Sequence, residues 1–168
     1  MLFRSRECGG IVWVDSELGR GTTFTVWLPR VPSEAVAAPE GAAAQGRGQV
    51  VLAVDDEPEV LAALEEMLAS LGYEPAGFTD GREALEAVRA DPRRFDAVVS
   101  DEVMPLLTGT QLAVELRKVN PGLPVVIASG YGGAGFETRA LSAGVNRVLK
   151  KPYRMNDIGE ALASVLAG

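Results

Sequence analysis

The sequence contains no histidine and a single cysteine, Cys8, among its 168 residues. Without histidine the chain lacks the commonest general base and metal ligand, and it cannot form a phosphohistidine of its own. A lone cysteine forms no internal disulfide, so we predict a reducing, cytoplasmic setting. No apolar run approaches the roughly 20 residues that cross a bilayer, and we predict no membrane segment. Any chemistry must therefore rest on carboxylates, hydroxyls and cationic side chains.

Acidic residues exceed basic residues in only one part of the chain. Of 23 acids and 16 bases, five of each lie in residues 1–48, which leaves 18 acids and 11 bases for residues 49–168 and places the whole net charge of −7 there. An acidic domain repels the phosphate backbone of nucleic acids. We therefore predict that no nucleic acid is among the partners.

The first 48 residues divide into two segments of different composition. Gly10–Ser16 and Thr22–Leu28 are predicted to be two strands joined by a turn, which makes residues 1–30 a β-hairpin extension, and the second strand shows the alternation of a half-buried strand. Residues 31–48 are small, contain Pro and Gly, and have almost no large apolar side chains. Such a segment buries too little surface to offset its ordering entropy, so we predict a flexible linker.

From residue 49 to residue 168, strand and helix patterns alternate. The predicted strands are Val50–Val54, Glu74–Phe78, Asp96–Ser100, Pro124–Ala128 and Asn146–Leu149. Helical spacing of apolar residues begins at Pro58 and again after Asp80, and it returns in residues 108–119, Phe136–Ala143 and Met155–Leu166. This alternation predicts an α/β fold, a doubly wound five-stranded parallel sheet with the flavodoxin-like strand order 2-1-3-4-5.

Polar side chains stand at the carboxyl ends of four of these strands. Asp55 and Asp56 follow the first strand, Asp101 the third, Ser129 the fourth and Lys151 the fifth. Because ligands of such sheets lie outside the carboxyl ends of the strands, we expect these residues on one rim. Clustered carboxylates favour Mg²⁺, which takes one or two of them and leaves positions for phosphate oxygens. A carboxylate is also a competent nucleophile toward phosphorus, so the rim suits phosphoryl transfer.

Residues 49–168 resemble the receiver domain of response regulators over their full length. The marks are Asp55-Asp56, the segment from Asp101 to Pro105, Ser129-Gly130 and Lys151-Pro152, in that order and each at a strand end. One such mark is weak, whereas four in order are specific. The resemblance implies a two-component phosphorelay module, not a free-standing enzyme, whose partner is a histidine kinase or a histidine phosphotransfer protein.

The resemblance also implies a role for each residue of the rim. Asp101 would be the phosphoacceptor, and Asp56, Asp101 and the Val103 carbonyl would bind Mg²⁺. Asp55 would hold a metal-bound water, Lys151 would contact the phosphoryl group, and Ser129 would act as a switch hydroxyl. The Lys151–Pro152 peptide bond is expected to be cis. Many receivers have an aromatic residue three positions before the lysine, where this chain has Val148, so the aromatic half of that switch is missing.

The N-terminal segment is similar to a second family over about 20 residues. The stretch from Gly10 to Pro29, with Ser16-Glu-Leu-Gly-Arg-Gly21, resembles the closing hairpin of a histidine-kinase ATP-binding domain, as in a hybrid histidine kinase. In such a fragment Trp13 and Trp27 are expected to be exposed, which would favour a homodimer. Two alternatives stay open: a pseudo-receiver that never turns over phosphate, and an ATP-dependent kinase.

Overall fold

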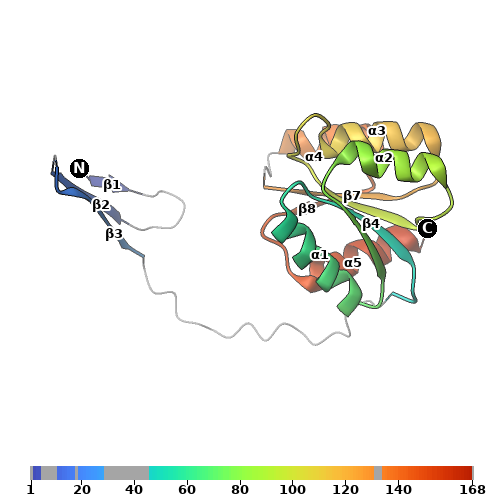
Figure 1. Ribbon diagram of the computed structural model, residues 1–168, viewed down its shortest axis with the longest axis horizontal. Coiled ribbons are helices and arrows are strands. Elements are labelled where there is room, and N and C mark those ends of the chain that lie inside the picture. Colours follow the sequence, from blue (N-terminus) through green and yellow to red (C-terminus); the bar gives the residue numbers. More distant parts are fainter. Residues whose placement is uncertain (1, 5–10, 18, 29–45, 131–133, 168) are drawn as a thin grey trace. The chain divides into compact units, whose positions relative to one another are not determined.

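The computed structural model describes residues 2–4, 11–17, 19–28, 46–130 and 134–167. The chain divides into two compact units, Met1–Glu40 and Gly41–Gly168, and Figure 1 shows a small sheet in the first and a larger layered domain in the second. In the described residues no helix combines the length and the apolar character that a membrane span requires.

The first unit is a three-stranded antiparallel sheet of order β1-β2-β3. Its strands are β1 (Leu2–Arg4), β2 (Ile11–Glu17) and β3 (Gly21–Trp27). The predicted hairpin is therefore confirmed, although Gly10 lies outside the described residues and Leu28 follows the end of β3. The sequence pattern did not reveal β1, because three residues are too few to show a periodicity.

The apolar side chains of this sheet are exposed on both faces. The paired residues Ile11 and Trp27 lie on one face, and Val14 and Phe24 lie on the other. Trp27 is 71% exposed and Phe24 is 67% exposed. The exposure expected of Trp13 and Trp27 is therefore found, and these strands form no buried core of their own among the described residues.

The second unit is built on a five-stranded sheet in which every pairing is parallel. Its strands are β4 (Val50–Val54), β5 (Glu74–Phe78), β6 (Ala97–Asp101), β7 (Val125–Ser129) and β8 (Arg147–Lys150). Their spatial order is β5-β4-β6-β7-β8. This is the predicted order 2-1-3-4-5, so the flavodoxin-like fold is confirmed.

Five helices cover the two faces of this sheet (Figure 1). They are α1 (Pro58–Ser70), α2 (Gly81–Ala90), α3 (Gly109–Val119), α4 (Ala134–Ser142) and α5 (Met155–Leu166). Leu64 of α1 and Leu162 of α5 belong to one buried cluster, whereas Val88 of α2 and Leu112 of α3 belong to the other. Because β4, β6 and β7 are covered on both sides, their residues form continuous apolar runs without alternation.

Three strands extend one residue farther toward the carboxyl end than their apolar pattern predicts. β6 ends at Asp101, β7 ends at Ser129 and β8 ends at Lys150. Asp101 pairs with Ala128, and Ser129 pairs with Lys150. Backbone pairing does not depend on the polarity of the side chain, so the last strand residues can be the polar residues of the rim. Asp101 and Ser129 are thus held by the sheet itself.

The segment predicted as a linker ends earlier than we expected. Residues 31–45 lie outside the described residues. The Gly46 N–H donates to the Leu71 carbonyl at 2.7 Å, and the Gly48 N–H donates to the Gly72 carbonyl at 2.9 Å. A Cβ atom at Gly46 would stand 2.6 Å from the Tyr73 ring. Residues 46–48 therefore pack on the turn after α1, because glycine allows the backbone to approach that closely.

The first residue of α3 lies directly against the end of β6. A Cβ atom at Gly109 would stand 2.3 Å from the Asp101 carbonyl oxygen and 2.9 Å from Ile127 Cδ1. Both neighbours belong to strands of the central sheet and cannot easily move. Only glycine fits at this position without displacing the backbone of Asp101.

We therefore expect Gly109→Ala to lower the free energy of unfolding by about 1–3 kcal/mol, as overpacking of a rigid site does. Urea denaturation of the purified variant measures this change. Gly122→Ala is the matched control, because its Cβ atom would meet Asn120 Oδ1 at an ordinary 3.5 Å. Equal effects of the two substitutions would contradict the proposed close contact.

Candidate functional site

The structure brings three of the predicted site residues together at the carboxyl ends of the strands. Asp55 directly follows β4 and is 2% exposed, and Asp101 ends β6 and is 9% exposed. Lys151 follows β8, and its Nζ lies 2.9 Å from Asp101 Oδ1 and 3.4 Å from Asp55 Oδ2. The prediction that four strand ends share one rim is thereby confirmed for β4, β6 and β8.

The backbone around Lys151 directs its side chain toward the carboxylates. The Lys151 N–H donates to the Ser129 carbonyl at 2.9 Å. The Lys151–Pro152 peptide bond is cis, as expected. The main chain therefore stays paired with β7 up to Lys151 and then turns, which leaves the long lysine side chain to reach across the rim.

Backbone N–H groups hold the two buried carboxylates as well. Asp101 Oδ1 receives the Lys151 ammonium, while Asp101 Oδ2 accepts from the Val103 N–H at 3.1 Å. Asp55 Oδ1 accepts from the Glu57 N–H at 3.0 Å. Two carboxylates thus share one ammonium group. The three side chains therefore carry a net negative charge that can attract a cation.

The charge of Lys151 is stabilised by its neighbours. Burial alone would lower the pKa of the Lys151 ammonium. The hydrogen bond to Asp101 and the charges of Asp101 and Asp55 outweigh this effect and raise its pKa above the ordinary value of 10.5. Lys151 is therefore a permanent cation of the rim at neutral pH.

The remaining predicted residues surround this ion pair. Ser129 is 1% exposed at the end of β7, and Val103 follows β6 with a side chain that is 60% exposed. Asp56 is half-buried next to Asp55 and lines a shallow cavity of about 280 Å³ at the beginning of α1. The structure thus places all these residues at the rim, but their chemical roles stay predictions.

The donor set of the rim suits a hard divalent cation. Within the described residues, no three acidic, cysteine or histidine side chains are grouped closely enough to bind a metal by themselves. Mg²⁺ does not need three, because it takes one or two carboxylates and completes its shell with carbonyl oxygens and water. The net negative charge of Asp55, Asp101 and Lys151 is what such an ion would neutralise.

Residues that the sequence analysis overlooked hold the loop after Asp101. Glu102 Oε2 accepts from the Thr110 N–H at 2.9 Å and from the Thr110 hydroxyl at 2.7 Å. The buried Ser100 hydroxyl donates to the Asp101 carbonyl at 2.9 Å. No sequence motif predicts these contacts, because Glu102 and Thr110 lie eight residues apart on opposite sides of a loop. Only the capping sequence at Thr108 hinted that α3 begins there.

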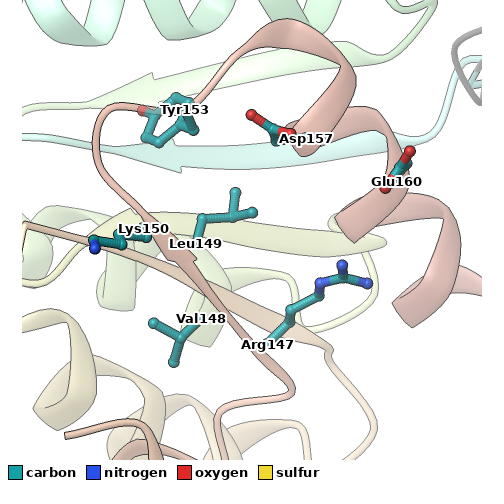
Figure 2. A pocket seen from close by; sticks show the side chains of 7 residues that line it. All are labelled: Arg147, Val148, Leu149, Lys150, Tyr153, Asp157 and Glu160. Carbon is teal, nitrogen blue, oxygen red and sulfur yellow. The ribbon is translucent and has the colours of Figure 1, made fainter. Parts of the chain in front are cut away.

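A separate cavity of about 290 Å³ lies between β8 and α5. Figure 2 shows Val148 and Arg147 on the strand side, and Tyr153 and Asp157 at the approach to and the first turn of the helix. The cavity contains none of the rim carboxylates. Val148 lines this cavity, and Tyr153 is the aromatic residue among its lining side chains.

Tyr153 is electrostatically coupled to the rim. Burial raises the pKa of its phenol, and the Asp55 and Asp101 carboxylates raise it too, whereas the Lys151 cation lowers it. The side chain therefore stays neutral at physiological pH.

Comparison with known proteins decides the family. Residues 51–163 match the response regulator receiver domain. The chain belongs to this family. A receiver is a phosphorelay module of two-component systems, as the resemblance of residues 49–168 implied.

The relatives of this receiver include both single-domain proteins and large kinases. The chemotaxis protein CheY of Thermotoga maritima is 32% identical over 119 residues, which cover 70% of this chain and 98% of CheY. The sensor kinase CckA of Brucella abortus is 32% identical over 171 residues, which cover 96% of this chain but 18% of the kinase. The chain therefore spans less than a fifth of that relative's length.

Solved receivers share the fold. A receiver domain from Clostridium thermocellum has a TM-score of 0.68 and 26% identity, and the match covers 71% of this chain and 94% of that one. The receiver domain of a sensor histidine kinase from Pseudomonas aeruginosa has a TM-score of 0.65 and 28% identity, covering 72% and 99%. That structure contains a magnesium ion coordinated in the active-site cleft.

Removal of the Lys151 ammonium should destabilise this receiver. We expect Lys151→Met to lower the free energy of unfolding by about 2 kcal/mol at neutral pH, because Asp55 and Asp101 lose their cation. The expected loss is smaller than for a fully buried ion pair, since the Lys151 side chain is 30% exposed. The pKa of Lys151 is raised in the folded protein, so the ion-pair contribution is complete below 10.5 and is lost as pH rises through the raised pKa.

Urea denaturation at several pH values below and above 10.5 tests this expectation. The difference in the free energy of unfolding between wild type and Lys151→Met should become smaller only at pH values above 10.5. The control is Lys150→Met at the exposed neighbouring position, which we expect to change stability by less than about 0.5 kcal/mol. A difference that stays constant at high pH would show that the ion pair is not its cause.

Proposed function

We propose that this receiver accepts a phosphoryl group on Asp101 from a phosphohistidine of a partner protein, either a histidine kinase or a histidine phosphotransfer protein. The observation that carries this proposal is the position of the Asp101 carboxylate, which is held between the Lys151 ammonium at 2.9 Å and the Val103 N–H at 3.1 Å. A buried carboxylate that is fixed in this way is oriented for attack on a phosphorus atom at the carboxyl ends of the strands.

The transfer is a single displacement at phosphorus. A carboxylate oxygen of Asp101 forms the new O–P bond while the P–N bond to the partner imidazole breaks, and the released imidazole nitrogen takes up a proton from water. The Lys151 ammonium, next to Asp101 Oδ1, stabilises negative charge on the phosphoryl oxygens. Ser129, whose carbonyl accepts from the Lys151 N–H, offers its hydroxyl as the switch group.

Magnesium is part of the proposal. Asp56, Asp101 and the Val103 carbonyl would hold Mg²⁺, and Asp55 would contact it through a water molecule. When bound, the ion would neutralise charge on the phosphoryl oxygens. The net negative charge of Asp55, Asp101 and Lys151 supports this assignment. The magnesium-bound receiver domain from Pseudomonas aeruginosa, at 28% identity, supports it as well.

We also infer that residues 1–30 correspond to the end of a histidine-kinase ATP-binding domain and that residues 49–168 are the receiver of a hybrid kinase. The similarity to CckA covers 96% of the chain, which reaches well beyond the receiver match at residues 51–163. The exposed apolar residues on both faces of the β1–β3 sheet fit a segment that packs on further layers of such a domain. No observation favours kinase activity of residues 1–30.

Incubation with acetyl phosphate and Mg²⁺ should add one phosphoryl group to the wild-type chain, and intact-mass spectrometry measures this addition. Asp101→Asn should abolish it, because the amide is not a nucleophile toward phosphorus. Asp96→Asn is the matched control at the opposite end of β6: its Oδ2 accepts from the Val50 N–H at 2.7 Å, a bond that an amide oxygen also makes. Labelling that survives Asp101→Asn would refute the proposal.

A magnesium titration separates the active receiver from a pseudo-receiver. We expect amide resonances of Asp56 and Val103 to shift with Mg²⁺ in the millimolar range, and Asp56→Asn to weaken binding about tenfold or more. The Arg147 amide resonance serves as the internal reference, because Arg147 begins β8 and so lies at the opposite end of that strand from Lys151. Spectra unchanged by Mg²⁺ would favour the pseudo-receiver.

A further inference from the structure

The loop after the phosphoacceptor is tied to the fold at Glu102. The Glu102 N–H donates to the Ala128 carbonyl at 2.9 Å and so extends the pairing of β6 with β7. The Glu102 carbonyl accepts from the Gly109 N–H at 3.1 Å. Its side-chain Oε2 accepts both from the Thr110 N–H at 2.9 Å and from the Thr110 hydroxyl at 2.7 Å. One residue thus joins β6, β7 and α3 directly beside Asp101.

These contacts complete the first turn of α3. The first N–H groups of a helix have no partner within the helix. In α3 the N–H groups of Gly109 and Thr110 donate to Glu102, and the Gln111 N–H donates to the Thr108 hydroxyl at 3.2 Å. A carboxylate at this end also interacts favourably with the helix dipole. Glu102 therefore fixes where α3 starts relative to the end of β6.

The same residue fixes the amide that orients Asp101. The Val103 N–H, which donates to Asp101 Oδ2 at 3.1 Å, belongs to the peptide group that directly follows Glu102. The Val103 side chain is 60% exposed, so its own packing contributes little to this position. The anchors on either side are Glu102 and the buried Met104, which is 7% exposed. Without the Glu102 carboxylate, one of these two anchors is weakened.

We propose that Glu102 is a positioning residue for phosphoryl transfer. Its carboxylate, held by Thr110, keeps the Glu102–Val103 peptide group in place, so that the Val103 N–H orients the Asp101 carboxylate. The proposal rests on the function proposed above, in which Asp101 accepts the phosphoryl group. A residue that only capped α3 would affect stability and leave the rim unchanged.

The test compares Glu102→Ala and Glu102→Gln with a control on the same helix. Glu115→Ala removes a carboxylate of α3 that pairs with Lys118 and Arg89 away from the rim. Two quantities are measured for each full-length chain: the dissociation constant for beryllofluoride with Mg²⁺, and the hydrogen-exchange rate of the Val103 amide by NMR. Thermal unfolding is recorded in parallel.

We expect Glu102→Ala to bind beryllofluoride about tenfold more weakly, which is typical when a residue that supports a ligand is removed. Its Val103 amide should exchange faster than in the wild type. Glu102→Gln keeps an acceptor oxygen for Thr110 and should stay close to wild type in both quantities. Glu115→Ala should leave both quantities unchanged.

A double-mutant cycle examines the route through Thr110. Thr110→Val removes the hydroxyl and keeps the N–H, so its loss of affinity should be smaller than that of Glu102→Ala. In the double variant the two losses should not add, because both substitutions break the same contact. Full additivity would show that Glu102 does not act through Thr110.

The other outcomes decide whether Glu102 positions the Val103 amide or only caps α3. If Glu102→Ala is less stable but keeps the wild-type affinity and Val103 exchange rate, Glu102 is a helix cap only and the inference is wrong. If Glu102→Ala does not fold, Glu102→Gln and Thr110→Val carry the comparison. If the wild type itself does not bind beryllofluoride, the proposed function fails. The Val103 exchange rate then still shows whether Glu102 holds the Val103 amide in place, since that rate does not depend on phosphoryl chemistry.

Discussion

Asp55 and Asp101 can remain buried close together because the Lys151 ammonium lies within 3.4 Å of the first and 2.9 Å of the second. Two carboxylates removed from water repel each other unless a cation lies close to both. One ammonium group offsets this repulsion only in part, so the three side chains carry a net negative charge. The binding of a divalent cation that we propose depends on this charge balance.

The ion pair works only with a rigid frame around it. Asp101 is the last residue of a buried strand, and Gly109 of α3 approaches its carbonyl so closely that no side chain would fit between them. Glu102 then connects the end of β6 to the beginning of α3. The Asp101 carboxylate is therefore held in a frame made by the sheet, by α3 and by the loop between them.

The two units of the chain follow different physical rules. Residues 46–167 bury continuous apolar strands under helices on both faces of the sheet and so form two cores. The β1–β3 sheet instead exposes Trp27 and Phe24 on opposite faces. A small sheet with both faces exposed is only marginally stable in water, whereas the sheet of the receiver is covered by its own helices.

The fold and the identity of the rim residues were predictable from patterns within single segments of the chain. Alternating strand and helix patterns predicted the parallel sheet and its order, and the polar residues that end the apolar runs predicted Asp55, Asp101, Ser129 and Lys151. Local patterns were sufficient for the strands of the parallel sheet, because strands that are buried on both faces consist of continuous apolar residues. The pattern placed the ends of β6 and β7 one residue too early, since pairing continues through polar residues that hydropathy assigns to loops.

How the rim residues share their charges, and which contacts hold them, became visible in the folded chain alone. The contact of Lys151 with Asp55 joins residues 96 positions apart, and the bonds of Glu102 to Thr110 cross a loop of no regular pattern. The docking of residues 46–48 on the turn after α1 was hidden for the same reason. Such contacts depend on distances between segments far apart in the chain, and no periodicity within one segment records them.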